Sequence, residues 1–316
     1  MKILVTGGAG FIGSNLVQTL LEDDRVIYVR VLDDLSTGFR HNLKSIVDHP
    51  KFEFMEGDIS DYKTCVAACK NIDRISHQAA LGSVPRSIKN PIRSNEVNIG
   101  GTLNILTAAK EEGIDRVVYA ASSSTYGDSK KLPKIEDEIG QPLSPYAVTK
   151  LVNELYAKVF HDLYDIDTVG LRYFNIFGPQ QDPNGAYAAV IPLFFKAALE
   201  NNPPTINGDG SFSRDFTFVA NAVQANILAL FTEEENALNQ VYNIACGSRT
   251  TLNELWAIIK KESGTQVDAQ YGAERVGDVS HSLADINKAK RLLGYSPEVS
   301  VEEGLKYAFE WYKTSL

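Results

Sequence analysis

Short apolar runs alternate with amphipathic segments through the first half of the chain. Apolar runs of the β type occur at residues 2–6, 29–32, 52–55, 74–77, 117–121 and 168–173. Apolar residues at helical spacing fall between most of them, at residues 11–21, 61–69, 94–112 and 145–163. Strands that are apolar almost throughout and alternate with helices are typical of a parallel sheet covered on both faces. We therefore predict an α/β fold with a Rossmann-type, doubly wound parallel sheet.

The pattern changes after residue 175. Residues 177–187 are rich in Gly, Pro, Gln, Asp and Asn, which indicates a loop. Short helices and strands follow in irregular order, and a last helix is predicted at residues 301–312. We predict a first domain at 1–175 and a smaller, mixed α/β lobe at 176–316. We expect some later segments, such as 216–231, to pack back on the first domain.

The composition is that of an ordinary globular protein. Of the 316 residues, 44% are apolar and 22% are charged, which excludes a disordered, collagen-like or coiled-coil chain. Against 31 Lys and Arg stand 40 Asp and Glu, so the formal net charge is -9. An acidic chain without a basic block is a poor partner for nucleic acid. It can still bind an anionic small molecule, but only through positive groups gathered locally.

The three cysteines, Cys65, Cys69 and Cys246, are an odd number in a chain of this size, which indicates free thiols in a reducing cytosol. The five histidines form no pair at metal-ligand spacing, so no metal site is predicted. The first strand begins almost at Met1, which leaves no room for a signal peptide. No apolar run reaches the length of about 18 residues that a bilayer span needs. We expect a soluble, cytoplasmic protein with no membrane partner.

A glycine-rich turn follows the first predicted strand. The run LVTGGAGFIG, residues 4–13, combines the spacings G-x-G-x-x-G and G-x-x-G-x-x-G. Gly7 and Gly10 allow a tight turn close to a pyrophosphate, and Gly13 lets the next helix lie close to the strand. That helix starts at Phe11 and Ile12, and its N-terminus supplies oriented donors and partial positive charge. The turn is therefore predicted to bind a dinucleotide.

Acidic residues end the second and third predicted strands. Asp33 lies twenty residues after Gly13, where a carboxylate can bond the ribose hydroxyls of a dinucleotide. Because this carboxylate would repel a 2′-phosphate, it favours NAD over NADP. Asp58 and Ile59 end the third run and could contact adenine, with a simple turn at the strand end as the alternative.

Tyr146 and Lys150 form a Tyr-x-x-x-Lys pair at the start of a predicted helix, so their side chains share one helical face. A free tyrosine has a pKa of about 10, too high for a base at neutral pH. A nearby lysine cation and the positive nicotinamide of NAD⁺ would lower that pKa and make Tyr146 a candidate general acid and base. Ser122, Ser123 and Ser124 lie just past the fifth predicted strand, where ligands bind in open α/β sheets.

Together these features make the chain similar to the extended short-chain dehydrogenase/reductase superfamily over essentially its whole length. Within that superfamily it resembles the UDP-N-acetylhexosamine 4-epimerases of bacterial surface-polysaccharide synthesis. The strings that carry the resemblance, in order, are HQAALGSVPRS (77–87), AASSSTYGD (120–128), LSPYAVTK (143–150), GLRYFNIFGPQQDPNGAYAAVIP (170–192), INGDGSFSRDF (206–216) and GDVSHSLADI (277–286).

The resemblance implies a tightly bound NAD⁺ and a UDP-sugar substrate. It makes Tyr146 the acid and base at the sugar O4, with Lys150 tuning it and holding the nicotinamide ribose. Ser122 would assist at O4, and Ser123 and Ser124 could share that work. The further residues that it implies at the cofactor are Asp34, Gln78, Ala79, Ala80, Asn98 and Tyr173. Those that it implies at the substrate are Gly82, Ser83, Asn175, Gln181, Ala189, Val190, Asn207, Arg214, Arg275, Asp278 and Ser282.

Four of these residues would hold the nucleotide part of the substrate. Asn175, Arg214 and Arg275 would meet the diphosphate, because guanidinium groups suit phosphate oxygens. Asp278 would bond the uridine ribose. Without the resemblance, the two arginines are equally consistent with surface or structural ion pairs.

The implied reaction is a transient oxidation. Tyr146 takes the O4 proton while hydride passes from C4 to NAD⁺, the 4-keto sugar turns over, and both return to the opposite face. Ser282 is small where a bulky tyrosine would crowd an N-acetyl group, and Gly82, Ser83 and Gln181 match the acetamido-preferring group. We therefore expect interconversion of UDP-GlcNAc and UDP-GalNAc, with UDP-glucose 4-epimerisation as the alternative.

Other functions remain open. Nucleotide-sugar 4,6-dehydratases and UDP-glucuronate decarboxylases share the fold and the Tyr–Lys pair, but would carry an acid beside the strand-five hydroxyl. Residues 122–126 contain no Asp or Glu. A non-catalytic, NAD-sensing protein would typically lack the Tyr–Lys pair. The resemblance also implies a homodimer through the helices at 94–112 and 145–163, although these helices could simply cover the sheet.

Overall fold

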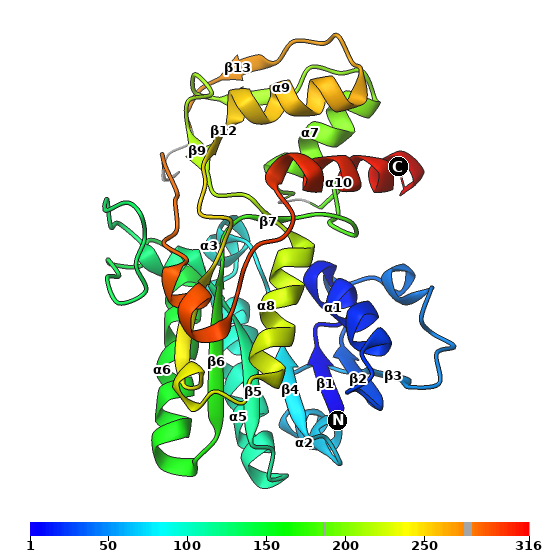
Figure 1. Cartoon of the computed structure of the whole chain (residues 1–316), viewed down its shortest axis with the longest axis vertical. Coiled ribbons are helices and arrows are strands. Elements are labelled where there is room, and N and C mark those ends of the chain that lie inside the picture. The colour runs from blue at the N-terminus through cyan, green and yellow to red at the C-terminus, as the bar shows by residue number, and fades with distance from the viewer. Residues whose placement is uncertain (186–187, 275–279, 316) are drawn as a thin grey trace.

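The computed structural model describes residues 1–185, 188–274 and 280–315. At its centre lies a sheet of seven parallel strands in the order β11-β6-β5-β4-β1-β2-β3 (Figure 1). The strands are β1 (Lys2–Thr6), β2 (Tyr28–Asp33), β3 (Phe52–Glu56), β4 (Arg74–His77), β5 (Arg116–Ser122), β6 (Asp167–Tyr173) and β11 (Gln240–Ile244). This is the Rossmann order with one strand added beside β6, which confirms the predicted fold class.

The six predicted strands are all present, but the seventh, β11, was not predicted. It pairs with β6, with Tyr242 opposite Leu171. Because β11 is a short run in an irregular part of the sequence, only its packing beside β6 identifies it as a sheet strand. Residues on both sides of position 175 thus share the sheet, and the division into two domains stays a prediction.

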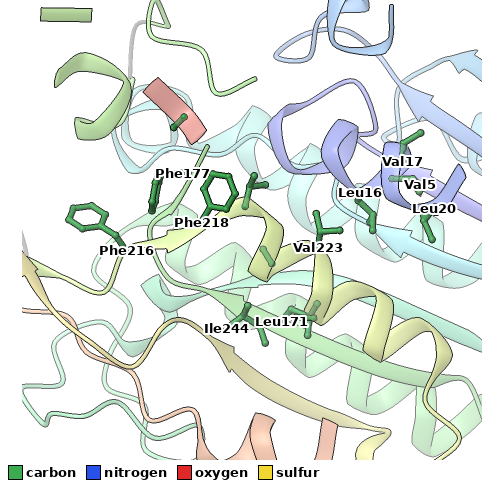
Figure 2. Packing of buried hydrophobic residues seen from close by; sticks show 14 of the residues in the cluster. Val5, Leu16, Val17, Leu20, Leu171, Phe177, Phe216, Phe218, Val223 and Ile244 are labelled. Atoms are coloured by element: carbon green, nitrogen blue, oxygen red, sulfur yellow. The ribbon is translucent and has the colours of Figure 1, made fainter. Parts of the chain in front are cut away.

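Helices cover both faces of the sheet. One face carries α1 (Phe11–Glu22) and α8 (Val219–Phe231), and the other α2 (Tyr62–Cys69), α5 (Gly101–Glu111) and α6 (Pro145–Tyr164) (Figure 1). Alternate residues of β1 explain this arrangement, because Ile3 and Val5 belong to the first core and Leu4 to the second. Figure 2 shows the first core, which includes Val5, Leu16, Val17, Leu20, Leu171, Val223 and Ile244.

Short elements connect the main helices. α3 (Val84–Lys89) precedes α4 (Pro91–Asn95), which continues through a π turn at Glu96–Gly100 into α5, so the helix predicted at 94–112 begins earlier. The remaining single turns are the 3₁₀ turns Arg40–Leu43, Ser123–Tyr126 and Glu235–Ala237 and the π turn Ala289–Leu293.

A smaller α/β lobe stands above the sheet (Figure 1). Its helices are α7 (Val190–Leu199), α9 (Leu252–Ser263) and α10 (Val301–Ser315). Three two-stranded sheets accompany them: β7 (Ile176–Phe177) with β10 (Thr217–Phe218), β9 (Ser213–Arg214) with β12 (Thr250–Thr251), and β8 (Thr205–Asn207) with β13 (Gln270–Gly272). Its core is aromatic, since the Phe195 ring lies 5.8 Å from that of Phe309 and 5.2 Å from that of Tyr312.

Helix α6 carries the predicted Tyr–Lys pair, and its start is fixed locally. The Ser144 hydroxyl accepts a hydrogen bond from the backbone N–H of Ala147 at 3.1 Å, and Pro145 occupies the first turn. The helix ends at Asp165, which adopts the left-handed conformation. The sequence around Ser144 therefore determines where Tyr146 enters the helix.

A buried ion pair ties α6 to the sheet. Arg172 of β6 binds Glu154 of α6 through two bonds, Nε to Oε1 at 2.9 Å and Nη2 to Oε2 at 2.8 Å. Only 4% of the Arg172 side chain and 8% of the Glu154 side chain is exposed. Arg172 also donates to the Glu136 carbonyl oxygen at 2.8 Å and lies 4.9 Å from the centre of the Tyr126 ring. One guanidinium thus braces both α6 and the turn that follows β5.

We expect Arg172→Met to lower the free energy of unfolding by about 3–5 kcal/mol, because Glu154 would stay buried without its partner. The double variant Arg172→Met/Glu154→Met should recover most of this loss, since two apolar side chains of similar volume replace the pair. Urea unfolding of the wild type and both variants measures the difference. A double variant as unstable as the single one would contradict this account.

Candidate active site

A cavity of about 450 Å³ opens at the carboxyl ends of β1, β4, β5 and β6. The strand order reverses between β1 and β4, which is where ligands bind in open α/β sheets. The predicted site residues that line this cavity are Gly7, Gly10, Phe11, Ile12, Gly13, Asp33, Asp34, Asp58, Ile59, Gln78, Ala79, Ala80, Gly82, Ser122, Tyr146, Lys150, Tyr173, Asn175 and Gln181. Residues separated by up to 174 positions in the sequence therefore meet at one site.

The glycine turn has the geometry that a diphosphate requires. Gly7 has a φ of +70°, and a Cβ at this position would lie 2.7 Å from the backbone nitrogen of Ala79. A Cβ at Gly13 would collide with the carbonyl oxygen of Gly7. Gly10, at the N-cap of α1, offers no side-chain cap, and the first turn of α1 carries no acidic residue. The first turn of α1, whose Phe11, Ile12 and Gly13 line the cavity, therefore has no acidic side chain of its own to compete with a bound anion.

Two acidic residues border the part of the cavity next to β2 and β3. Asp33 accepts hydrogen bonds from the backbone N–H groups of Ala9 at 2.9 Å and Leu35 at 2.8 Å. Burial raises the pKa of Asp33, and these two bonds partly offset the increase. Asp58 accepts from the Ser60 N–H at 2.7 Å and pairs with Arg93 at 2.5 Å. Both carboxylates are thus held in place by their own neighbours while they line the cavity.

Tyr146 and Ser122, which ends β5, line the same cavity, and the Ser122 hydroxyl acts to lower the pKa of the Tyr146 phenol. The Ser122 oxygen accepts two bonds from Ser124, from its N–H at 3.1 Å and from its hydroxyl at 2.9 Å. Because Ser124 supplies the hydrogens of both bonds, the hydrogen of Ser122 is available for the Tyr146 oxygen. Lys150 lies one helical turn further along α6, with Nζ 5.9 Å from the centre of the Tyr146 ring.

Burial is the main influence of the protein on the pKa of Tyr146, and the expected lowering by Lys150 together with NAD⁺ stays a prediction. Burial raises this pKa, and the Ser122 hydroxyl only partly opposes the rise. Lys150 Nζ donates to the carbonyl oxygen of Ala120 at 2.7 Å. Burial lowers the pKa of Lys150 to about 8, and the negative charge of Glu154 opposes that shift. Lys150 is thus a cation that loses its proton easily, held beside the phenol by a fixed acceptor.

Four predicted residues near this centre do not line the cavity. Asn98 lies behind it, where its side chain bonds both backbone groups of Leu81 and the Thr149 hydroxyl. The hydroxyl of Ser83 caps α3 by accepting from the Arg86 N–H at 3.3 Å. Ser123 and Ser124 form the turn after β5, and Ser124 reaches the site through Ser122. Asn98, Ser83 and Ser124 therefore support neighbouring wall residues.

The predicted substrate residues of the smaller lobe also lie outside the cavity lining. They are Ala189, Val190, Asn207, Arg214 and Ser282. The backbone N–H of Ser282 donates to the Ser213 carbonyl oxygen at 3.0 Å, so Ser282 and Arg214 lie on adjoining segments. Arg214 donates to the Ser280 carbonyl oxygen at 3.2 Å. Arg275 and Asp278 lie outside the described residues.

The sequence-based prediction missed several residues of the cavity wall. They are Leu32, Ser36, Thr37, Gly57, Leu81, Arg86, Val97, Ala120, Ala121 and Ile176. Most of them directly adjoin predicted residues at strand ends, so strand position alone could have found them. Arg86 is different, because it comes from α3, a helix that the apolar pattern did not reveal.

Neither a membrane-spanning helix nor a metal-binding cluster of three or more His, Cys, Asp or Glu occurs within residues 1–185, 188–274 and 280–315.

Comparisons with known proteins agree with this architecture. Residues 3–245 match the NAD dependent epimerase/dehydratase family. The chain is 40% identical over 315 residues to a putative UDP-glucose 4-epimerase of Methanocaldococcus jannaschii, covering 99% of both chains.

Two solved structures show the same fold. A UDP-N-acetylglucosamine 4-epimerase from Methanobrevibacter ruminantium, solved in complex with UDP-N-acetylmuramic acid, has a TM-score of 0.94 and 40% identity, covering 100% of this chain and 99% of that one. The UDP-glucose 4-epimerase of Thermus thermophilus, solved in complex with NAD, has a TM-score of 0.89 and 33% identity, covering 100% of both. With a glycine turn and Asp33 that fit NAD, the chain belongs to the NAD-dependent epimerase/dehydratase family, and NAD is its cofactor.

Proposed function

We propose that the protein interconverts the C4 epimers of a UDP-sugar, with UDP-GlcNAc and UDP-GalNAc as its preferred pair. The observation that carries the proposal is that Ser122, Tyr146 and Lys150 line the same cavity as the glycine turn, with Lys150 Nζ 5.9 Å from the centre of the Tyr146 ring. A phenol with a hydrogen-bond donor and a nearby cation is suited to take up and return a proton. The similarity to two kinds of UDP-sugar 4-epimerase supports the same reaction.

Three parts of the cavity would hold the cofactor. The N–H groups around Gly10 and Gly13 suit its diphosphate, and the Asp33 carboxylate suits the ribose next to adenine. Lys150 and Tyr173 would hold its nicotinamide end. NAD supplies a hydride acceptor and donor for C4 of the sugar.

The protein's own residues transfer the proton of the sugar O4 hydroxyl and hold the sugar in position. Tyr146 takes the proton of the O4 hydroxyl as C4 is oxidised, and later returns it to O4 of the opposite epimer. When the sugar is bound, Ser122 turns its one hydroxyl hydrogen from the Tyr146 oxygen to O4, and the Lys150 cation favours the phenolate. Because oxidation and reduction cancel, the reaction has no net redox change.

The smaller lobe would hold the UDP part while the sugar ring turns over. Arg214 and Ser282 lie on adjoining segments, and the buried Asp215 carboxylate fastens this region through the N–H groups of Cys246, Gly247 and Ala284 at 3.0, 3.1 and 3.2 Å. We propose that Arg214 meets the diphosphate, and that Ala189, Val190 and Asn207 border the nucleotide. The assignments of Arg275 and Asp278, and the domain boundary at 175, belong to the same proposal.

Two observations favour an acetamido sugar. Among the described residues, Gln181 Oε1 is buried without a hydrogen-bond partner, while its Nε2 donates to the Ile176 carbonyl oxygen at 3.2 Å. Since Gln181 lines the cavity, we propose that its amide turns toward the cavity and that this oxygen then accepts from the N–H of an acetamido group. The second is the small side chain of Ser282, which we propose borders the sugar at a point where a tyrosine would crowd an N-acetyl group.

We further propose a homodimer formed through α6 and the continuous helical segment of α4 and α5, which contains the helix predicted at 94–112. Three apolar side chains on one side of α6 are exposed, with Val148 at 45%, Leu155 at 58% and Val159 at 45%. Ile92 of α4 is 73% exposed and borders the same groove as Val148. A second copy of this chain that packs on these four apolar side chains would shield them from water. The cytoplasmic location and a role in polysaccharide synthesis also stay proposals.

Tyr146→Phe should lower kcat by about 100- to 10,000-fold, the usual contribution of a positioned acid and base. The purified protein, with no NAD added, is incubated with UDP-GlcNAc, and the UDP-sugars are separated by chromatography. Tyr156→Phe is the matched control, because Tyr156 lies on the same helix but outside the cavity lining. Undiminished epimerisation by Tyr146→Phe would refute the assigned mechanism.

Comparing UDP-GlcNAc with UDP-glucose as substrates tests the proposed sugar preference. We expect kcat/KM to be at least about tenfold higher for UDP-GlcNAc than for UDP-glucose, as a buried polar group in the site favours the substrate that bonds it. Ser282→Tyr should lose activity selectively on the acetylated pair. A higher kcat/KM of the wild type for UDP-glucose and UDP-galactose would contradict the proposed specificity. UDP-glucose 4-epimerisation would then be the function.

Leu155→Asp should convert the proposed dimer into a monomer, because it would place a carboxylate in the centre of an apolar contact. Light scattering after size-exclusion chromatography measures the mass. Ile27→Asp is the control, since Ile27 is 61% exposed but lies between α1 and β2, away from α6. A wild type that is already monomeric, or a Leu155→Asp variant that stays dimeric, would contradict this interface.

A further inference from the structure

Four side chains form a closed ring of hydrogen bonds behind the cavity. Ser76 belongs to β4 and Gln78 follows it, Tyr173 ends β6, and Asn226 belongs to α8. Gln78 and Tyr173 line the cavity, whereas Ser76 and Asn226 do not. The ring joins β4 and β6, which lie on either side of β5, to α8, a helix from the second half of the chain.

Every polar atom of the two amides in this ring has a partner. Asn226 Nδ2 donates to the Tyr173 hydroxyl at 2.7 Å and to the Ala222 carbonyl oxygen at 2.8 Å. Gln78 Nε2 donates to Asn226 Oδ1 at 2.9 Å and to Ser76 Oγ at 2.9 Å. Tyr173 donates to Gln78 Oε1 at 3.0 Å, and Ser76 donates to Asn226 Oδ1 at 3.2 Å.

One backbone carbonyl sets the direction of all these bonds. The Ala222 oxygen can only accept, so the Asn226 amide must turn its Nδ2 toward it and its Oδ1 toward Gln78. Gln78 must then present its Nε2 to Asn226, which leaves its Oε1 for Tyr173. The hydrogen of the Tyr173 hydroxyl is thereby committed to Gln78.

We propose that Asn226 is a positioning residue that fixes Tyr173 and Gln78 as the rigid wall of the cofactor cavity and withholds the Tyr173 proton from the reaction. The inference rests on the proposed function in taking this wall to hold the nicotinamide end of NAD. The ring gives Tyr173 a different role from Tyr146, the other tyrosine that lines the cavity. Tyr146 lines the cavity together with Ser122, whereas the Tyr173 oxygen is bonded on both sides within the ring. Burial also raises the pKa of Tyr173, which keeps it protonated.

The test replaces Asn226 by leucine, which has nearly the same shape and no polar atom. Without the ring, Tyr173 and Gln78 are free to turn, and we expect bound NAD to exchange about fivefold faster, the effect of losing one hydrogen bond. Exchange of the retained NAD against labelled NAD, followed in the purified holoenzyme, measures this rate.

Asn221→Leu is the matched control. Asn221 lies on the same helix, and Asn221 and Asn226 are 1% and 0% exposed. Its amide is equally engaged, donating to the Val299 carbonyl oxygen at 2.8 Å and accepting from the N–H groups of Glu298 and Val299 at 3.0 and 3.1 Å. Asn221→Leu should lower the free energy of unfolding by about as much as Asn226→Leu does, without changing the rate of NAD exchange. Equal exchange rates in the Asn226→Leu and Asn221→Leu variants would overturn the inference.

A double-mutant cycle tests whether Asn226 acts through Tyr173, and its Tyr173→Phe arm tests the inference even where Asn226→Leu folds poorly. Tyr173→Phe alone should speed NAD exchange to a similar degree, and Asn226→Leu should add little in that background. Wild-type exchange in Tyr173→Phe would contradict the inference, and so would fully additive effects. Because exchange is measured without substrate, a protein that shows these effects but converts no UDP-sugar would refute only the proposed function.

Discussion

The burial of both faces of the parallel sheet constrains everything else in this molecule. Each strand contributes side chains to two cores, as Leu4 and Val5 do in β1, so the faces have no room for a ligand. Chemistry is confined to the strand ends. At the carboxyl ends, where the strand order reverses between β1 and β4, the chain places its glycine turn, its acidic residues and Ser122. The sheet thus fixes the site before any catalytic side chain is considered.

Helix α6 places charged groups in a buried position against the sheet, where the loss of hydration disfavours their charged forms. Tyr146, Lys150 and Glu154 follow one another at intervals of four residues, so they share one face against the sheet. Burial opposes the charge on Lys150, and Glu154 opposes that effect. Glu154 is itself buried and depends on Arg172. The cation beside the phenol is therefore the end of a chain of compensating charges that begins in β6.

Local sequence was enough for the features that depend on neighbours in the chain. The glycine turn, the capped start of α6 at Ser144 and the six strands of the first half all follow from short-range steric and hydrophobic rules. Features that depend on distant partners were not predictable in this way. β11 is a strand because β6 offers it an edge, and Lys150 bonds Ala120 rather than acting only on Tyr146. Propensity and spacing do not contain that information.

The order of elements along the chain explains why the second half cannot be treated as a substrate lobe alone. α8 and β11 follow the first lobe segment and return to the sheet, so Asn226 reaches the cofactor wall from a helix that lies between parts of the smaller lobe. The same stretch begins next to Asp215, which fastens the region of Arg214. A displacement of α8 would therefore act both on the cavity wall at Tyr173 and on the segment that carries Arg214. The two halves of the site are coupled by chain connectivity, because α8 packs against the sheet and leads directly out of the smaller lobe.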